Sequence, residues 1–363
     1  MMMPRLTLIT TLLSTALAQD TFWKESFKLD FSYDTNSQQG DGPNKWGNVN
    51  VANSEWRQYA VGHELFDLNI GNNECTNRIR PSPIPLRKTG RCSDEHELFT
   101  RQINDSDCTR NDITFELTPH TLRAYFPEND DTCERPTIEM DGNTGDPFVL
   151  TWMEVHARSE HVVDGRRYDA ELQMVHMGTS NSDDEMAIVS ILIDASARED
   201  HTEFQYLLDQ WQSVASDQTA KCGETTRSLR IRDEVVPNQE SRRAQQQQQC
   251  TGKDCGPRRK MYPYSMWPSV WYFRYSGSLT TPPCSAIVNW RIVDKEMLIS
   301  RRQYKQLTTL LTANKDGDCQ DDTVLSATGE NFRPLQNVNN NNQNVEHCTK
   351  ADFGVLQYAA DEQ

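Results

Sequence analysis

The sequence predicts a mainly β protein of the α+β class, and three observations support this prediction. Two β-rich runs, Phe148–Ala157 and Ala170–Met177, flank a loop whose Asp164-Gly165 pair is a turn signal. A third run, Ala187–Ile193, is apolar and almost unbroken. Such a run is typical of a central strand that is buried on both faces.

The other elements follow in chain order. Residues Ile113–Phe126 alternate well enough for one strand, or for a hairpin that is broken at Pro119. Strand character resumes at Ser269–Tyr275 and Ser285–Val293, on either side of a Thr-Thr-Pro-Pro loop. Ser300-Arg-Arg-Gln303 predicts a capping box at the start of a helix. The apolar positions of that helix are Tyr304, Leu307 and Leu311.

The first two β-rich runs carry polar side chains that can meet. Side chains in a strand alternate between faces, so every second residue shares a face. If the two runs pair, the residues on one face of each converge on one spot. They are Trp152, Glu154 and His156 on the first run, and Glu171, Gln173 and Val175 on the second. A strand pair of this kind builds a tetrahedral zinc site with one open position when three of the residues are histidines.

Length and charge limit the classes of function. A chain of 363 residues buries a sizeable core in one large domain or two modest ones. The net charge of −16 argues against nucleic-acid partners and anionic membranes, which favour a basic patch. We therefore expect no nucleic-acid partner.

The N-terminus predicts a secretory signal peptide over residues 1–18. Arg5 supplies the positive charge, Leu6–Leu13 is mostly apolar, and Ala16-Leu17-Ala18 is a small-residue cleavage site. The apolar run is too short to span a bilayer, and no later stretch qualifies as a membrane span. Ten cysteines without a C-x-x-C pair fit disulfides in an oxidising compartment. We expect a secreted or luminal, extracellular protein.

Several motifs resemble the α-class carbonic anhydrases. The strongest are Ser159-Glu160-His161, Ala170-Glu171-Leu172 and the block Tyr275–Cys284, YSGSLTTPPC. Weaker matches are Arg80–Ile84, Gly42-Pro43 with Trp46, and Asn331–Pro334. The blocks keep the order of that family from about Phe31 to Gln336. The resemblance implies the α-carbonic anhydrase fold, a large and mostly antiparallel twisted central sheet with short peripheral helices.

The resemblance also divides the chain. Residues 19–336 form the carbonic anhydrase-like domain, and residues 337–363 are an Asn-rich spacer and a C-terminal tail, which we interpret as an appendage. Residues 196–262 are an insertion where the family needs a short connection. Its first part has helical spacing, and its later part is a Gln-rich, low-complexity segment. The insertion is either decoration or a partner-binding element. The helical positions are Phe204, Leu207, Leu208, Trp211 and Ala215.

The zinc ligands of the family do not carry over to this chain. The resemblance places the three metal-binding histidines on Glu154, His156 and Gln173, so His156 alone is kept. A carboxylate at Glu154 binds zinc but lowers the net charge of the site, and the amide of Gln173 is a poor ligand. Trp152 stands where the family has a glutamine that orients the first ligand.

Neither of two nearby histidines is a replacement ligand. His161 matches a structural histidine of the family, and His176 lies an odd number of residues from Gln173, so that it faces away. We expect no stoichiometric metal. Zinc is the cofactor that the resemblance implies if the protein is active.

Other roles of the family do carry over. Thr280 would accept a hydrogen bond from a zinc-bound hydroxide, and Glu160 would orient Thr280. His120 resembles the proton-shuttle histidine, and we expect it to be exposed near a turn. The pocket residues are Glu171, Trp152, Val175, Leu279 and Thr281, with Glu171 behind the third ligand position. The frame around the metal position is therefore predicted to be intact.

Secreted relatives commonly carry a disulfide that would join Cys75 to Cys284 here. Cys222, Cys250 and Cys255 lie in the insertion, so any bridges there should be local. Closing the long loop between Cys75 and Cys284 stabilises the fold by about 4 kcal/mol or less.

Three functional interpretations follow. The preferred one is a secreted, carbonic anhydrase-like protein without normal zinc-dependent CO2 hydration, which acts as a binding or structural relative with an unknown protein or glycan partner. The alternative is an active carbonic anhydrase, a lyase that hydrates CO2 reversibly to bicarbonate at an unusual Glu154, His156 and Gln173 site. The third, a different activity in the same pocket, is neither supported nor excluded by the sequence.

Overall fold

The computed structural model describes the regions that surround the predicted sheet. These are residues 31–36, 42–49, 73–76, 80–88, 92, 108–127, 133–138, 147–178, 186–230, 259–337 and 344–349. The predicted signal peptide, the Gln-rich segment, and Cys250 and Cys255 lie outside the described residues.

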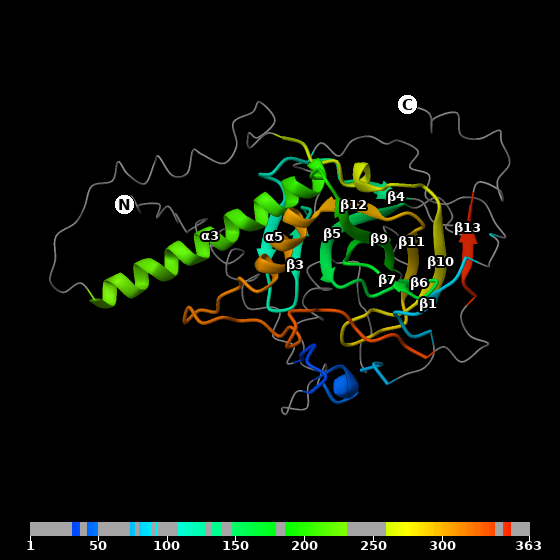
Figure 1. The fold of residues 1–363 in the computed structure, drawn as a ribbon, viewed down its shortest axis with the longest axis horizontal. Coiled ribbons are helices and arrows are strands. Elements are labelled where there is room, and N and C mark those ends of the chain that lie inside the picture. The colour runs from blue at the N-terminus through cyan, green and yellow to red at the C-terminus, as the bar shows by residue number, and fades with distance from the viewer. Residues whose placement is uncertain are drawn as a thin grey trace, which may run out of the picture.

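A ten-stranded sheet forms the centre of the molecule (Figure 1). Eight strands follow one another in the order β13-β10-β11-β9-β8-β5-β3-β2, while β12 pairs with β9 and β4 with β5. Two pairings, β9 with β11 and β9 with β12, are parallel, and the others in this sheet are antiparallel. The predicted, mostly antiparallel sheet is therefore confirmed.

The bounds of the sheet strands are β2 Thr114–Leu117, β3 Leu122–Tyr125, β4 Thr137–Ile138, β5 Phe148–Ala157, β8 Ala170–Gly178, β9 Met186–Ala197, β10 Tyr272–Gly277, β11 Val288–Val293, β12 Met297–Ser300 and β13 Glu346–Cys348. A small sheet joins β1 Pro85–Leu86, β6 Val162–Val163 and β7 Arg166–Arg167. The helices are η1 Pro43–Asn48, α3 Thr202–Arg230, η3 Pro263–Met266 and α5 Arg301–Leu311.

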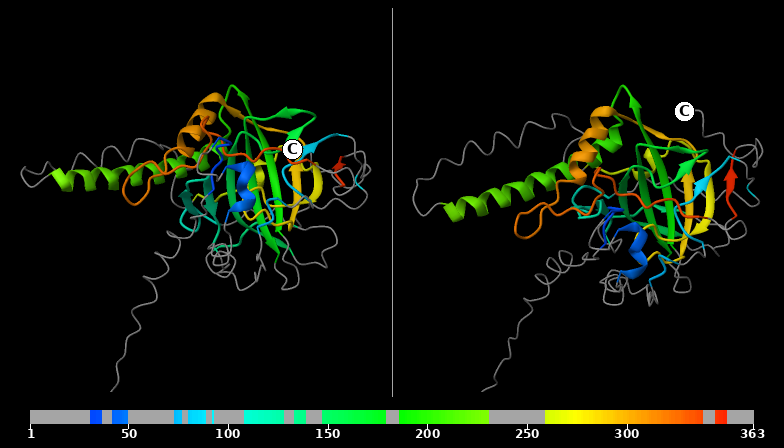
Figure 2. Two further views of the ribbon diagram at one scale, coloured as in Figure 1. Left: turned by 90° about the horizontal axis from the view of Figure 1, so that it is seen from below. Right: turned by 60° about the horizontal axis from the view of Figure 1, so that its bottom comes forward.

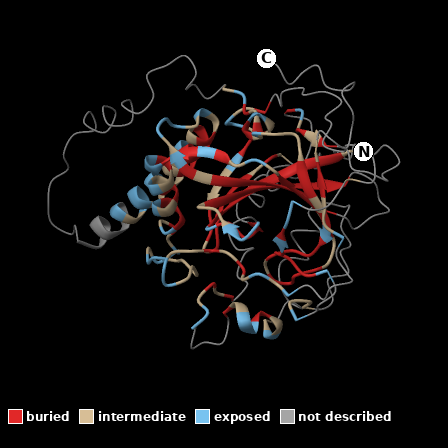
Figure 3. Ribbon diagram, turned by 45° about the vertical axis from the view of Figure 1, so that its right-hand side comes forward, coloured by how far each residue is buried: buried red, intermediate tan, exposed pale blue. Residues whose placement is uncertain are grey.

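The central strands are covered on both faces. Every residue of β5 and β8 is buried, as is nearly all of β9, which confirms the prediction for Ala187–Ile193 (Figure 3). One face of these strands, including Met153, Leu172 and Val189, packs in a large apolar cluster with α3 and α5. The opposite face carries the predicted polar residues together with a second apolar cluster.

Local signals in the sequence account for the connections. Asp164 and Gly165 have φ of +48° and +81°, which suits the tight β6–β7 turn that their sequence predicts. Residues Ile113–Phe126 form the hairpin of β2 and β3 rather than a single strand. The capping box at Ser300 and Gln303 is present at the start of α5.

The first half of the insertion belongs to the core. Phe204, Leu207, Leu208 and Trp211 of α3 are fully buried against the sheet, and the Trp211 indole packs edge-on to Phe115 with ring centroids 6.2 Å apart. The far half of α3 extends beyond the sheet (Figures 1 and 2). This helix is therefore a structural element, and the interpretation of its first half as decoration is wrong.

Four disulfides join segments that are distant in the sequence. They are Cys75–Cys284, Cys92–Cys348, Cys108–Cys133 and Cys222–Cys319. The predicted Cys75–Cys284 pair is confirmed, and Cys348 of the tail is tied to Cys92 while β13 extends the sheet beside β10. The expectation of a local bridge for Cys222 is wrong. The reason is that α3 packs along α5, which brings Cys222 to the loop that contains Cys319.

Replacing Trp211 with Ala tests the structural role of α3. We expect Trp211→Ala to lower the free energy of unfolding by about 3–5 kcal/mol, because a fully buried indole leaves a cavity. Urea unfolding followed by circular dichroism measures the change. Trp211→Phe is the matched control, since it keeps most of the ring but loses a hydrogen bond, at about 1 kcal/mol. An unfolding free energy that is equal in Trp211→Ala and wild type would contradict the assignment.

Candidate functional site

A row of polar side chains crosses the sheet at the predicted site. In the β5–β8 pairing, Trp152 faces Val175, Glu154 faces Gln173, and His156 faces Glu171. The predicted convergence of these residues is confirmed. The row continues on both sides, because Arg123 of β3 faces Glu154 and Ser190 of β9 faces Gln173.

Arg123 and Glu154 form a buried ion pair. The Arg123 Nε atom donates to Glu154 Oε2 at 2.8 Å, and the Trp152 indole Nε1 donates to the same oxygen at 3.1 Å. Each of the two charged residues is 7% exposed. The guanidinium also lies over the Trp152 ring, 5.9 Å from its centroid. Glu154 is thus held by an internal cation on a neighbouring strand.

The electrostatics agree with this geometry. Burial raises the pKa of Glu154, but the charge of Arg123, the nearby His156 ring and the hydrogen bond from Trp152 outweigh burial and lower this pKa to about 2. Sequence reasoning missed Arg123. The available signal was that a carboxylate in a buried strand requires a cationic or hydrogen-bonding partner.

His156 lies between two carboxylates and a backbone carbonyl. Its Nδ1 is 2.7 Å from the Asn331 carbonyl oxygen, and its Nε2, which has no hydrogen-bond partner, is 3.5 Å from Glu154 Oε1. Burial lowers the pKa of His156, but the charges of Glu160 and Glu154 outweigh burial and raise this pKa to about 9. The two carboxylates therefore favour the protonated form of the ring.

Glu160 is hydrogen-bonded to Gln173 and not to Thr280, the partner that the family resemblance implies. The Gln173 amide Nε2 donates to Glu160 Oε2 at 2.8 Å and to Glu171 Oε1 at 3.2 Å. The other Glu160 oxygen accepts from the backbone N–H of Arg333 at 3.0 Å. Within the described part of the chain, no hydrogen bond joins Glu160 to Thr280, which is itself buried. The prediction of an intact frame is wrong in this respect. The Gln173 amide, and not the Thr280 hydroxyl, donates to the Glu160 carboxylate.

Glu171 anchors a second network behind the row. It accepts from the backbone N–H and ring Nδ1 of His161, both at 2.8 Å, and from Ser190 Oγ at 2.7 Å. The other ring nitrogen of His161 is 2.7 Å from the Tyr275 hydroxyl, which donates to Ser82 Oγ at 3.0 Å. Burial raises the pKa of Glu171, but the charge of His161 outweighs burial and lowers it to about 2. His161 has the structural place predicted for it.

His176 lies on the opposite face of β8, as predicted. Its Nε2 is 2.8 Å from the Tyr264 hydroxyl, and burial lowers the pKa of its ring to about 3. It therefore cannot replace a ligand at the row.

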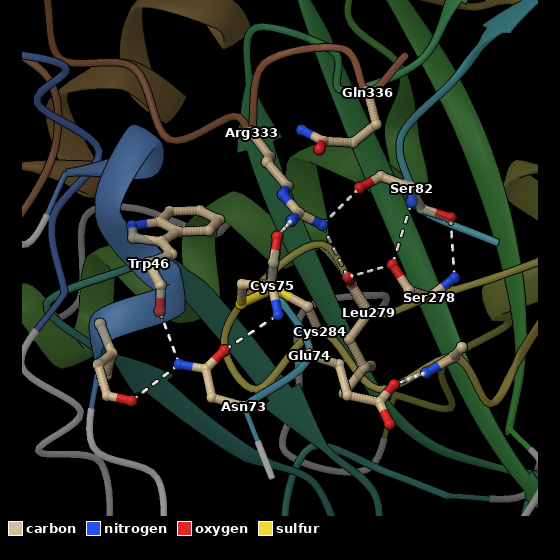
Figure 4. The surroundings of a disulfide bond; sticks show 12 residues. Trp46, Asn73, Glu74, Cys75, Ser82, Ser278, Leu279, Cys284, Arg333 and Gln336 are labelled. Carbon is tan, nitrogen blue, oxygen red and sulfur yellow. Dashed lines mark hydrogen bonds between the residues drawn. A yellow bond between two sulfur atoms is a disulfide. The ribbon is translucent and has the colours of Figure 1, made fainter. Parts of the chain in front are cut away.

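The loop that carries Thr280 is held by Arg333 and a disulfide (Figure 4). Arg333 donates to the carbonyl oxygens of Ser82 at 2.7 Å, Cys75 at 3.1 Å and Leu279 at 3.5 Å. Cys284 closes the loop by donating its N–H to Thr281 O at 2.8 Å and bonding to Cys75. The predicted pocket residues Leu279 and Val175 belong to one apolar cluster with Trp152, and Thr281 is half-buried.

His120 is buried, so the expectation that it is exposed is wrong. Its ring stacks on Phe31 of the N-terminal arm, with centroids 4.1 Å apart and planes at 3°, and it is 7% exposed. Burial and then the charge of Arg123 lower the pKa of His120 to about 3. A proton shuttle needs a pKa near the working pH and a path to water. This histidine provides neither feature.

The donor set does not fit the zinc that the fold implies. Both Glu154 oxygens face cations or donors on the protein, and Gln173 presents its NH2 group to two carboxylates. Among the described residues, one cluster of His, Cys, Asp and Glu brings three ligand atoms within 4.8 Å: Cys92, Glu346 and Cys348. Two of its members are joined in a disulfide, and it lies apart from the row.

A double-mutant cycle tests the ion pair. We expect Glu154→Gln to lower the free energy of unfolding by about 3–5 kcal/mol, because the substitution breaks a buried ion pair by removing one of its two charges. The matched double variant Arg123→Met/Glu154→Gln should recover most of this loss. Urea denaturation at neutral pH measures these two variants and the Arg123→Met single variant, which completes the cycle. Additive effects of the two substitutions would show that the charges do not depend on each other.

Comparisons with known proteins agree with this architecture. The family model for eukaryotic-type carbonic anhydrase matches residues 69–347. "Alpha carbonic anhydrase 7" of Arabidopsis thaliana is 24% identical over 91% of this chain and 90% of its own length, and "Dioscorin DB3L" of Dioscorea polystachya is 23% identical over 85% and 88%.

Solved structures show the same fold. The α-carbonic anhydrase of Thermovibrio ammonificans, in complex with sulfanilamide, has a TM-score of 0.52 and 17% identity over 88% of this chain and 99% of its own. Dioscorin complexed with ascorbate has a TM-score of 0.51 and 20% identity, with 88% and 99% covered. In the part of the chain that the structure describes, no helix is both long and apolar enough to cross a membrane.

Proposed function

This chain belongs to the eukaryotic-type carbonic anhydrase family, and we propose that it is a secreted or luminal member that holds no catalytic zinc and serves as a binding or structural protein. The observation that carries the proposal is the Arg123–Glu154 ion pair, which fills the first ligand position with a neutralised carboxylate. The partner is a protein or a glycan.

The first line of support is the chemistry of the three ligand positions. In the family, three neutral imidazoles leave the charge of zinc largely intact, so that its bound water ionises near neutral pH. Here a carboxylate, an imidazole and an amide stand at those positions, and the carboxylate is already paired. Loss of imidazole ligands and of their orienting neighbours lowers zinc affinity steeply.

The second line of support is the set of contacts made by Thr280 and His120 around the metal position. Thr280 lacks the Glu160 contact that would orient it. In its place, the Gln173 amide donates to Glu160 Oε2. His120 lies under Phe31 with a pKa of about 3. The loss of the His120 role is independent of the ligand positions, while the Thr280 role is lost through Gln173, which stands at one of them. This argues against the active alternative with a Glu154, His156 and Gln173 zinc site.

The cysteines support the proposed secreted or luminal location. Four disulfides among the described residues fit an oxidising compartment. The signal peptide proposed for residues 1–18 supplies the route.

Metal content and CO2 hydration test the proposal together. We expect the protein, secreted from eukaryotic cells and purified without chelators, to contain far less than one zinc per chain by plasma mass spectrometry. Stopped-flow CO2 hydration should match a buffer control, because no metal-bound water is available to ionise. An active carbonic anhydrase prepared in the same way is the positive control. One zinc per chain with hydration above buffer would overturn the proposal in favour of the active alternative.

A further inference from the structure

We propose that one side of α3 is a binding site for an anionic glycan, a sugar chain that carries sulfate or carboxylate groups. The site, which we call the α3 stripe, consists of Arg110, Arg259, Tyr206 and Gln210. α3 packs on the face of the sheet opposite to the polar row. The inference rests on the proposed function only in that it gives the partner-binding role a location and a ligand chemistry. It does not require the absence of zinc.

Backbone pairing brings the two arginines of the stripe together from distant segments. Thr109 and Lys260 form an antiparallel bridge outside the sheets. In an antiparallel register the residue after Thr109 faces the residue before Lys260. These two residues are Arg110 and Arg259, so both guanidiniums start from one place on the surface.

Both guanidiniums contact the same side of α3. The Arg259 Cζ atom is 4.2 Å from the centroid of the Tyr206 ring, and Arg259 pairs with Glu203. The Nη2 atom of Arg110 is 3.4 Å from Ser213 Oγ. Tyr206 and Ser213 are two helical turns apart, so the two contacts are about 10 Å from each other. This spacing fits a ligand with several anionic groups better than a single inorganic anion.

Two buried polar atoms of the stripe lack a protein partner. They are the Tyr206 hydroxyl and Gln210 Oε1, and neither has a hydrogen bond to any residue that the structure describes. Tyr206 is 7% exposed and Gln210 is 8% exposed. Burial raises the pKa of Tyr206, and the charges of Arg259 and Arg110 oppose this rise, so the hydroxyl is near both cations. Buried polar atoms usually have partners, and these two are available to a ligand.

The cations are also available. Arg110 and Lys260 are exposed, and within the described ranges neither has a carboxylate partner. Asp112, two residues after Arg110, accepts two hydrogen bonds of 2.7 Å from a neighbouring threonine. Arg259 has its partner in Glu203, but a guanidinium has five N–H donors. In a chain with a net charge of −16, this cluster of cations favours an anionic ligand.

The unpartnered atoms favour a sugar chain over an acidic peptide. Ionised carboxylate side chains accept hydrogen bonds but do not donate them, so they do not satisfy Gln210 Oε1. The hydroxyl groups of a sugar both donate and accept, and therefore suit both Gln210 Oε1 and the Tyr206 hydroxyl. Sulfate or carboxylate groups on the same chain suit the arginines.

Binding of a sulfated tetrasaccharide tests the inference. Isothermal titration calorimetry at low ionic strength compares it with the same tetrasaccharide without sulfate and with an acidic peptide of equal charge. We expect one site for the sulfated sugar, and affinities at least about tenfold lower for the other two probes. Arg110→Gln should weaken binding at least about tenfold, because it removes a charged donor. Tyr206→Phe should weaken it about fivefold, because it removes a neutral hydroxyl.

Arg166→Gln is the matched control. Arg166 is an exposed arginine of β7, which lies away from α3 (Figure 1), and this variant should bind the sulfated sugar as the wild type does. Circular dichroism confirms that each variant is folded, and the exposed position of Arg110 makes its substitution the one that least disturbs the fold.

Three results would overturn the inference. They are equal affinity for the sulfated and unsulfated sugars, equal affinity for the acidic peptide and the sulfated sugar, and equal weakening by Arg110→Gln and Arg166→Gln. Zinc content is measured on the same wild-type sample. Stoichiometric zinc with sugar binding would contradict the proposed absence of zinc and leave the glycan site standing. Absence of both zinc and sugar binding would contradict the glycan site alone.

Discussion

A buried carboxylate must be neutralised by its surroundings, and the rest of this site follows from that constraint. Glu154 is buried on a central strand, where an unpaired charge is costly, and Arg123 pairs with it at 2.8 Å. Once this pair is in place, the neighbouring positions must suit a site that already contains a cation. Gln173 turns its NH2 group to Glu160 and Glu171, and His156 is held between Glu154 and Glu160. The charges of these side chains are thus paired with one another.

The surrounding fold keeps this arrangement rigid. Arg333 donates to three backbone carbonyls near the Cys75–Cys284 bond, and Glu171 of β8 is linked to Tyr275 of β10 through His161. These elements belong to the features by which the chain resembles its family. The family architecture is therefore kept, while the contacts at its centre serve internal pairing. Under the proposed function, this chain keeps the fold of its family without the family's chemistry.

The sequence was sufficient to predict the fold and which side chains share a face of each strand. Both predictions use local signals, namely the alternation of side chains along a strand and the family motifs. It was insufficient for contacts that depend on pairing register or on distant segments. Arg123 meets Glu154 only through the β3–β5 register, and His120 is buried by Phe31 from the N-terminal arm. The Glu160–Gln173 hydrogen bond depends on how an amide is oriented. Cys222 reaches Cys319 because it is carried by a helix of 29 residues.

The most direct test of the account is a crystal structure of the unmodified protein grown with excess zinc, with anomalous diffraction recorded at the zinc absorption edge. The account predicts no anomalous peak among Glu154, His156 and Gln173, and a guanidinium of Arg123 paired with Glu154. An anomalous peak about 2.0–2.2 Å from a Glu154 oxygen and a His156 nitrogen, with Arg123 displaced from Glu154, would contradict it.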